Sequence, residues 1–206
     1  MTTNDKIIRV ALREILEKEK EKYKSEKKLP VEIFEEFGVS HGIARVDFAL
    51  VNGIMHGYEI KSDKDTLNRL PEQMKQYNAV FDKVTLVVGK KHLYHAVKTI
   101  PSWWGVILVK INKNKIVFQT IRKDGKNQQQ IDVSIARLLW RGEALKILEE
   151  RNEAAGIRSK TREIIHKKLA EILKNDLSTL KDYVRNALLV SRGDWRSVAQ
   201  PMLNGD

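Results

Sequence analysis

The strongest constraint on the fold is a turn signal, Asn52-Gly53, that lies between two apolar runs. An Asn-Gly pair in this setting indicates a β-hairpin, because both residues accept the positive φ angles of tight turns. Side chains alternate between the two faces of each strand. The segment RVDFALVNGIMHGYEIKSD therefore predicts two antiparallel strands whose side chains form two separate rows.

The register of this hairpin follows from the requirement that the apolar rows of both strands face one core. The apolar row comprises Val46, Phe48 and Leu50 on the first strand and Ile54, His56, Tyr58 and Ile60 on the second. A two-residue turn would place these rows on opposite faces, because a slip of one residue reverses every side chain. We therefore expect a three-residue loop over residues 51–53, with Gly53 in a left-handed conformation as a G1 bulge.

The same register places three charged side chains together on the other face of the hairpin. They are Asp47 on the first strand and Glu59 and Lys61 on the second. Two carboxylates held close together repel each other and favour a hard divalent cation between them. A neighbouring ammonium stabilises charge that develops on a phosphate. The cluster predicts a site for metal-assisted phosphodiester hydrolysis, and the alternative is an exposed pair of acids that lie opposite arginine or lysine.

Composition narrows the class of protein. The chain has 206 residues, of which 42% are hydrophobic, enough for one sizeable domain or for one domain with a small appendage. Cysteine is absent, which excludes disulfides and thiolate zinc sites. No apolar run reaches the roughly 18–20 residues of a membrane span, and the stretch MTTNDKIIRV has no apolar segment of the kind expected in a signal peptide. We expect a cytoplasmic protein, and the net charge of +11 favours nucleic acid over an anionic membrane as its partner.

Periodicity along the rest of the chain predicts an α/β fold. The expected elements around the hairpin are a helix over 4–25 capped by Asn4 or Asp5, a short strand within 31–42, a helix that Pro71 opens over 71–83, a buried strand over 84–89, a short helix over 92–98, and strands over 104–111 and 115–121. Helical patterns follow over 134–152, 159–175 and 177–190. This order predicts a mixed sheet flanked by helices over residues 1–125, with a small helical C-terminal region over 132–206 packed on it.

The hairpin and the helix after it make the chain resemble the PD-(D/E)XK nuclease superfamily. The signature of that superfamily is an acid on one strand, matched by Asp47, followed by Glu-x-Lys on the next, matched by Glu59-Ile60-Lys61. Val46 replaces the proline that names the motif. Gln73 and Tyr77 match the Gln-x-x-x-Tyr motif of the exonuclease-like branch and share one helix face. The runs GYEIKSDKDTLNRLPEQ and PSWWGV are most similar to a small bacterial and phage family within the superfamily.

The resemblance implies a restriction-endonuclease-like fold and a nuclease that hydrolyses DNA phosphodiester bonds by metal-activated water. It implies that Asp47, Glu59 and the main-chain carbonyl of Ile60 hold Mg²⁺ or Mn²⁺, whose preferred ligands are hard oxygens. Lys61 would orient the water and stabilise charge on the phosphate.

Further site residues are expected around this centre. The family often supplies an acid from the N-terminal region, and we favour Glu36 over Glu35 because Glu36 directly precedes an apolar anchor. Gln73 and Tyr77 would position the DNA. Arg45 falls on the site face, where contact with a phosphate and an ion pair with a carboxylate are both compatible with the sequence.

The superfamily serves restriction, repair, recombination and transposition, so the resemblance implies DNA as the partner without fixing a pathway. A non-catalytic module that binds DNA or protein on the same fold is the alternative function. Whether the chain acts alone, as a homodimer or in a larger complex is left open by the sequence.

Overall fold

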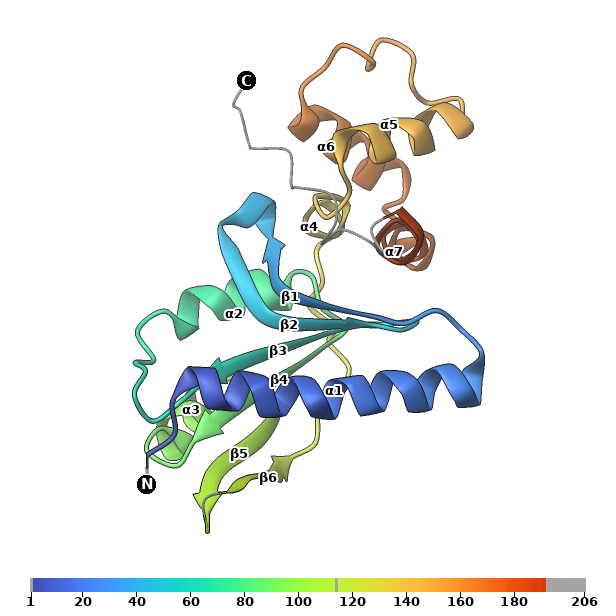
Figure 1. Ribbon diagram of the computed structural model, residues 1–206. Helices are drawn as coiled ribbons and strands as arrows, with labels where there is room; N and C mark the ends of the chain where they lie inside the picture. The colour runs from blue at the N-terminus through green and yellow to red at the C-terminus, as the bar shows by residue number, and fades with distance from the viewer. Residues whose placement is uncertain (1, 114, 192–206) are drawn as a thin grey trace.

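The computed structural model describes residues 2–113 and 115–191, and a six-stranded mixed sheet lies at its centre (Figure 1). The strands follow one another across the sheet in chain order: β1 (Glu32–Val39), β2 (Ala44–Val51), β3 (Met55–Lys61), β4 (Lys83–Gly89), β5 (Gly105–Asn112) and β6 (Lys115–Arg122). The pairs β3–β4 and β4–β5 are parallel, and the other three are antiparallel. The predicted α/β class with a mixed sheet is confirmed.

Helices cover both faces of the sheet. They are α1 (Asp5–Lys27), α2 (Leu70–Asn78), α3 (Leu93–Thr99), α4 (Asp132–Ala136), α5 (Arg141–Glu150), α6 (Arg162–Ile172) and α7 (Leu177–Asn186), with short turns η1 (Ser40–Gly42) and η2 (Ala187–Ser191). The prediction of a single helix over residues 134–152 is wrong. The backbone is extended at Trp140, and this residue separates α4 from α5. The Glu143 carboxylate accepts the Trp140 N–H at 2.7 Å and so caps α5.

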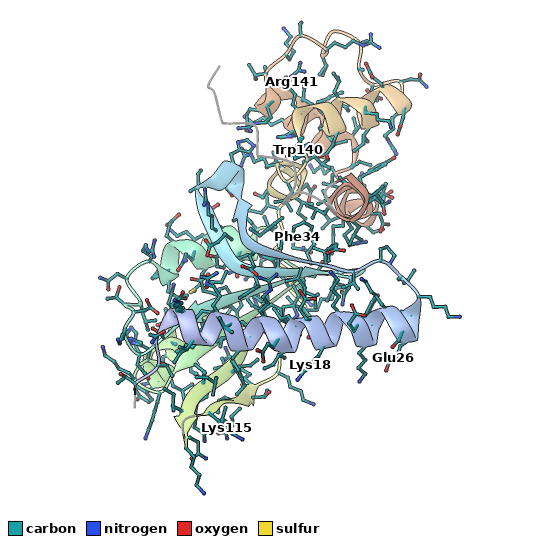
Figure 2. All side chains as sticks on the ribbon, viewed as in Figure 1. Lys18, Glu26, Phe34, Lys115, Trp140 and Arg141 are labelled. Atoms are coloured by element: carbon teal, nitrogen blue, oxygen red, sulfur yellow. The ribbon has the colours of Figure 1, made fainter. Side chains whose placement is uncertain are left out.

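Helix α1 crosses one face of the sheet and begins where the sequence predicts. The Asn4 side chain accepts the Ile7 N–H at 3.1 Å, which identifies Asn4 rather than Asp5 as the cap. The buried stripe of α1 and the strand residues it covers form a small cluster that includes Ile8, Leu12, Leu16, Phe48, Leu50, Tyr58 and Ile60. Lys18 and Glu26 lie on the exposed side of the helix (Figure 2).

The other face of the sheet carries the larger core. Side chains from the sheet, from α2 and from the C-terminal helices belong to one buried cluster that includes Phe34, Tyr77, Phe81, Trp104, Leu169 and Leu180. The helices α4–α7 therefore share a core with the sheet. The domain boundaries at 125 and 132 stay predictions, and residues 192–206 lie outside the described part of the chain. Among the described residues, no helix has the length and apolar character needed to cross a membrane.

The central hairpin has the predicted division of faces with a shifted loop. Val51 pairs with Met55, so the loop is 52–54 rather than 51–53. The shift leaves each strand's faces unchanged because the loop still has three residues. Gly53 has the expected positive φ, at 106°. Val46 departs from the prediction. It belongs to the larger core, whereas Phe48 belongs to the small cluster under α1, and Val46 lies beyond the point at which the β2–β3 ladder ends.

We predict that Gly53→Ala lowers the free energy of unfolding by about 1–2 kcal/mol, because a Cβ is unfavourable at positive φ. The added Cβ would also lie 3.3 Å from the Tyr23 hydroxyl. Gly142→Ala is the matched control, since no atom lies within 4 Å of a Cβ at this position in α5. It should be neutral or stabilise by up to about 1 kcal/mol. Equal losses in urea unfolding of both variants would contradict the turn geometry.

The turn between β1 and β2 contacts α6 through a histidine pair. The rings of His41 and His166 have centroids 5.6 Å apart, and His166 is fully buried. Burial and the neighbouring His41 lower the pKa of His166 to about 4. The fold therefore holds His166 in its neutral form, whereas the unfolded chain protonates it at its ordinary pKa.

This difference predicts acid sensitivity. Above about pH 6.5 the state of His166 should not change the free energy of unfolding. As the pH falls from there towards about 4, the free energy of unfolding should decrease, because the unfolded state then binds more protons than the folded state. Between pH 7 and pH 5 the wild-type chain should lose roughly 1–2 kcal/mol more than His166→Phe. Urea unfolding at the two pH values measures this, and an identical loss in both proteins would contradict it.

Candidate active site

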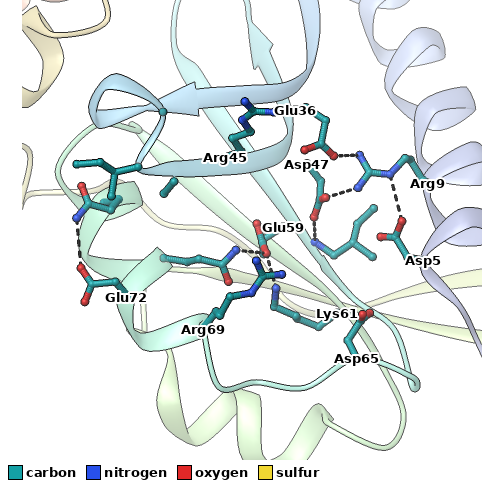
Figure 3. Close-up of a pocket in the computed structure, with 16 residues that line it drawn as sticks. Asp5, Arg9, Glu36, Arg45, Asp47, Glu59, Lys61, Asp65, Arg69 and Glu72 are labelled. Atoms are coloured by element: carbon teal, nitrogen blue, oxygen red, sulfur yellow. Dashed lines mark hydrogen bonds and ion pairs between the residues drawn. The ribbon is translucent and has the colours of Figure 1, made fainter. Parts of the chain in front are cut away.

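A pocket of about 700 Å³ lies between α1, α2 and the ends of β2 and β3 (Figure 3). It brings most of the predicted site residues together. Those that line it are Glu36, Arg45, Asp47, Glu59, Ile60, Lys61 and Gln73. Tyr77 reaches the same place through its hydroxyl, which lies 2.8 Å from the Glu59 carboxylate. Arg69 lines the pocket as well, and Arg9 does so without having been predicted.

The pocket opens where β2 and β3 separate. Their ladder ends at the pair Phe48 and Tyr58, and beyond it the Asp47 carboxylate accepts the Ile60 N–H at 2.6 Å. A side-chain oxygen thus replaces a main-chain acceptor at this point of the sheet. Because N–H and C=O of one strand residue point to the same side, the Ile60 carbonyl is directed towards Asp47.

Glu59 is the most enclosed charge of the site, with 2% of its surface exposed. Its Oε1 accepts from Lys61 Nζ at 2.5 Å and from Gln73 Nε2 at 2.7 Å, and the Tyr77 hydroxyl lies 2.8 Å from Oε2. A buried carboxylate needs such partners because desolvation is costly. Gln73 and Tyr77 therefore fix the orientation of Glu59. Their predicted contact with DNA remains a prediction.

Tyr77 also ties α2 to β2. Its hydroxyl also lies 2.6 Å from the Arg45 main-chain carbonyl. Burial and the Glu59 carboxylate raise the pKa of Tyr77 far above its ordinary range, so the phenol stays neutral. The Arg45 side chain itself is exposed and forms no ion pair with any residue that the structure describes.

The two carboxylates of the pocket interact electrostatically. Burial and the negative charge of Glu59 raise the pKa of Asp47 to about 7, although the Ile60 N–H and Arg9 oppose that rise. Such an increase is expected where two acids share a confined site. The arrangement therefore favours cations close to both carboxylates.

One of these cations is Arg9, on the first turns of α1. Its guanidinium pairs with Asp47, with Glu36 at 2.8 Å and with Asp5 at 3.3 Å (Figure 3). Burial alone would lower the pKa of Arg9, yet the carboxylates of Asp47 and Asp5 raise it above its ordinary value. Sequence reasoning missed Arg9 because 38 residues separate it from Asp47, and helical periodicity alone cannot place it against the hairpin.

The two N-terminal acids separate in the structure. Glu36 lines the pocket and pairs with Arg9, whereas Glu35 pairs with Arg13 at 2.7 Å, one helical turn along α1. Glu36 has a φ of 49°, an uncommon value for a non-glycine residue, at a point where its pairing with β2 is interrupted. Strained residues of this kind gather at functional sites. The placement favours Glu36 as the additional acid, whose catalytic role stays a prediction.

The donor set suits a hard cation with incomplete protein coordination. Among the described residues, no three histidine or acidic side chains form a metal-binding group. The predicted centre needs only two carboxylates and the Ile60 carbonyl, and Mg²⁺ commonly keeps several waters and substrate oxygens besides. Asp47 would exchange its pairing with Arg9 for such a cation.

Comparison with known proteins gives one family. The sequence profile of the family described as Bacteriophage P4 protein cII matches residues 2–192, so the chain belongs to that family. Protein cII of Enterobacteria phage P4 is 36% identical over 91 residues, which are 44% of this chain and 34% of the relative. The match spans about a third of that relative's length. No solved structure matches the chain.

The pocket predicts unequal roles for two neighbouring arginines. Arg9→Met should lower the free energy of unfolding by about 1–3 kcal/mol, because it leaves partly buried carboxylates without their cation. Arg13→Met is the matched control, since it removes a more exposed pair outside the pocket and should cost less than about 1 kcal/mol. Chemical denaturation compares the two, and equal costs would contradict the electrostatic account of the pocket.

Proposed function

We propose that this member of the phage P4 protein cII family is a Mg²⁺-dependent deoxyribonuclease of the PD-(D/E)XK type. One observation carries the proposal: Asp47, Glu59 and Lys61 line a single pocket, in the strand positions that the motif requires. The Gln73 and Tyr77 bonds to Glu59 add support, because they join the second motif to the first. The net charge of +11 fits DNA as the substrate.

Asp47, Glu59 and the Ile60 carbonyl would hold Mg²⁺ or Mn²⁺. When bound, the cation supplies Lewis-acid polarisation of the phosphodiester and activation of a water molecule. Lys61 is almost fully buried beside Glu59, and its ammonium would stabilise the charge that develops on the phosphate. Low exposure strengthens this interaction because little water screens it.

The remaining pocket residues would position the reacting groups. Gln73 and Tyr77 hold the Glu59 carboxylate in one orientation. Arg45 and Arg69 are exposed at the pocket, where they would contact phosphate oxygens of the DNA. Glu36, held by Arg9, would add a third acid once a cation replaces that arginine. The phage origin of the matched relative is compatible with processing of DNA in the cytoplasm, for repair, recombination or defence.

A non-catalytic binding module is the second candidate, and one observation favours it. Arg9 and Lys61 already neutralise the carboxylates of the pocket, so the fold has no electrostatic need for a metal. Such a module would bind DNA in the presence of a chelator and would cleave no substrate.

We predict divalent-dependent cleavage of at least one DNA among single-stranded, duplex, nicked and branched substrates. Asp47→Ala and Lys61→Ala should each lower the rate by at least about 100-fold, because each removes charge from the reacting centre. Lys146→Ala, an exposed lysine on α5, is the control and should retain activity. Retained cleavage in both site variants would contradict the proposal.

Direct metal binding separates the two candidates when cleavage is weak. Paramagnetic resonance of Mn²⁺ should detect one tightly bound ion in the wild-type chain and its loss in Asp47→Ala. Absence of Mn²⁺ binding, together with DNA binding in chelator, would replace the nuclease proposal by the binding module.

A further inference from the structure

The loops after β3 and β4 are locked together beside the pocket. Asp65 lines the pocket, and its main-chain carbonyl lies 2.9 Å from His92 Nε2. The Lys91 N–H donates to the Asp63 carboxylate, also at 2.9 Å. Gly89 permits this approach, because a Cβ there would lie 2.5 Å from an Asp63 oxygen. Helix α3, which follows the second loop, therefore begins beside the loop after β3 that lines the pocket (Figure 1).

The exposed charged side chains of these two loops and of α3 are positive. The acids have hydrogen-bond partners within the fold: Asp63 accepts from the Thr3 N–H and hydroxyl, and Asp65 accepts from the Ser62 N–H and hydroxyl. The cations are exposed, and none has an ion-pair partner among the described residues. We call this set the basic ridge: Lys64, Arg69, Lys90, Lys91 and Lys98.

An exposed aromatic ring stands on the basic ridge. Tyr94 of α3 is 74% exposed, and Lys98 Nζ lies 4.2 Å from its ring centroid. Tyr94 therefore adds little to the core. A cationic surface with an exposed aromatic ring is the combination that binds unpaired nucleic-acid strands, because the ring stacks on a base and the cations neutralise phosphates.

A second exposed apolar side chain lies at the pocket. Ile43 lines the pocket at the entry to β2 and is 77% exposed. It follows Ser40, His41 and Gly42, whose φ angles are 50°, 58° and 86°. A hydrogen bond of 2.5 Å from Ser40 to Gln76 holds this strained turn against α2. Apolar side chains presented in this way contact bases rather than phosphates.

We propose that the nucleic-acid strand which enters the pocket is unpaired there, with bases against Ile43 and Tyr94 and its phosphates along the basic ridge. A duplex keeps its bases stacked inside the helix, so either side chain would reach a base face only at the cost of unstacking base pairs. That the strand enters the pocket rests on the proposed function, whereas binding of a single strand at Ile43, Tyr94 and the basic ridge does not require catalysis.

Fluorescence anisotropy of the full chain in chelator tests the proposal. The probes are labelled oligo-dT, oligo-rU and a blunt duplex of the same length. At least one single strand should bind more tightly than the duplex, and the comparison of dT with rU identifies the preferred sugar. Tyr94→Ser should weaken binding of that single strand by roughly 10-fold, the effect of one stacked base, whereas Tyr94→Phe should retain it.

Ile43→Ser should weaken the same binding, whereas Leu29→Ser, an exposed apolar residue in the loop after α1, should not. Replacing both Lys90 and Lys91 by glutamine should reduce the slope of log Kd against log salt by about 1.4, the value for two phosphates of a single strand.

Duplex binding equal to or tighter than that of both single strands, no single-strand binding, or no effect of Tyr94→Ser and Ile43→Ser would overturn the proposal. These outcomes are independent of the cleavage test, which alone decides whether Asp47 and Lys61 act in hydrolysis.

Discussion

The hydrogen bond from the Ile60 N–H to the Asp47 carboxylate is the interaction on which the site depends. It replaces a main-chain bond where β2 and β3 separate, and the pocket opens at that separation. The bond also places a charged oxygen beside the main chain that links Glu59 to Lys61. The geometry of the sheet and the chemistry of the site are thus linked. The pocket opens where the β2–β3 ladder is interrupted, and Asp47, which bonds the main chain at that interruption, is one of the two carboxylates of the site.

The electrostatics of the pocket follow from that arrangement. Two largely buried carboxylates cannot remain charged together without cations, and the chain supplies Arg9 from α1 and Lys61 from β3. Tyr77 and Gln73 add neutral hydrogen bonds that fix Glu59 without altering its charge. The site is consequently organised before any ligand binds. A divalent cation would compete mainly with Arg9, which is the more exposed of the two internal cations.

Local patterns in the sequence predicted much of the fold. The alternation around Asn52-Gly53 and the proline in the first turn of α2 depend on neighbouring residues, so their structures could be inferred directly. For the same reason the sequence limited the cap of α1 to Asn4 or Asp5. The loop position was wrong by one residue because either register gives the same faces. The extended conformation at Trp140, the left-handed Glu36 and the contact between Arg9 and Asp47 depend on tertiary packing. Such tertiary contacts cannot be inferred from local periodicity, and it is these contacts that determine which residues complete the site.

The central claim is that the pocket exchanges its internal cation for a metal at Asp47, Glu59 and the Ile60 carbonyl. A crystal structure of the chain soaked with Mn²⁺, with the ion located by its anomalous scattering, tests this most directly. The account predicts one ion in contact with oxygens of all three residues and the Arg9 guanidinium displaced from Asp47. An empty pocket at saturating Mn²⁺, with Arg9 still paired to Asp47, would contradict it.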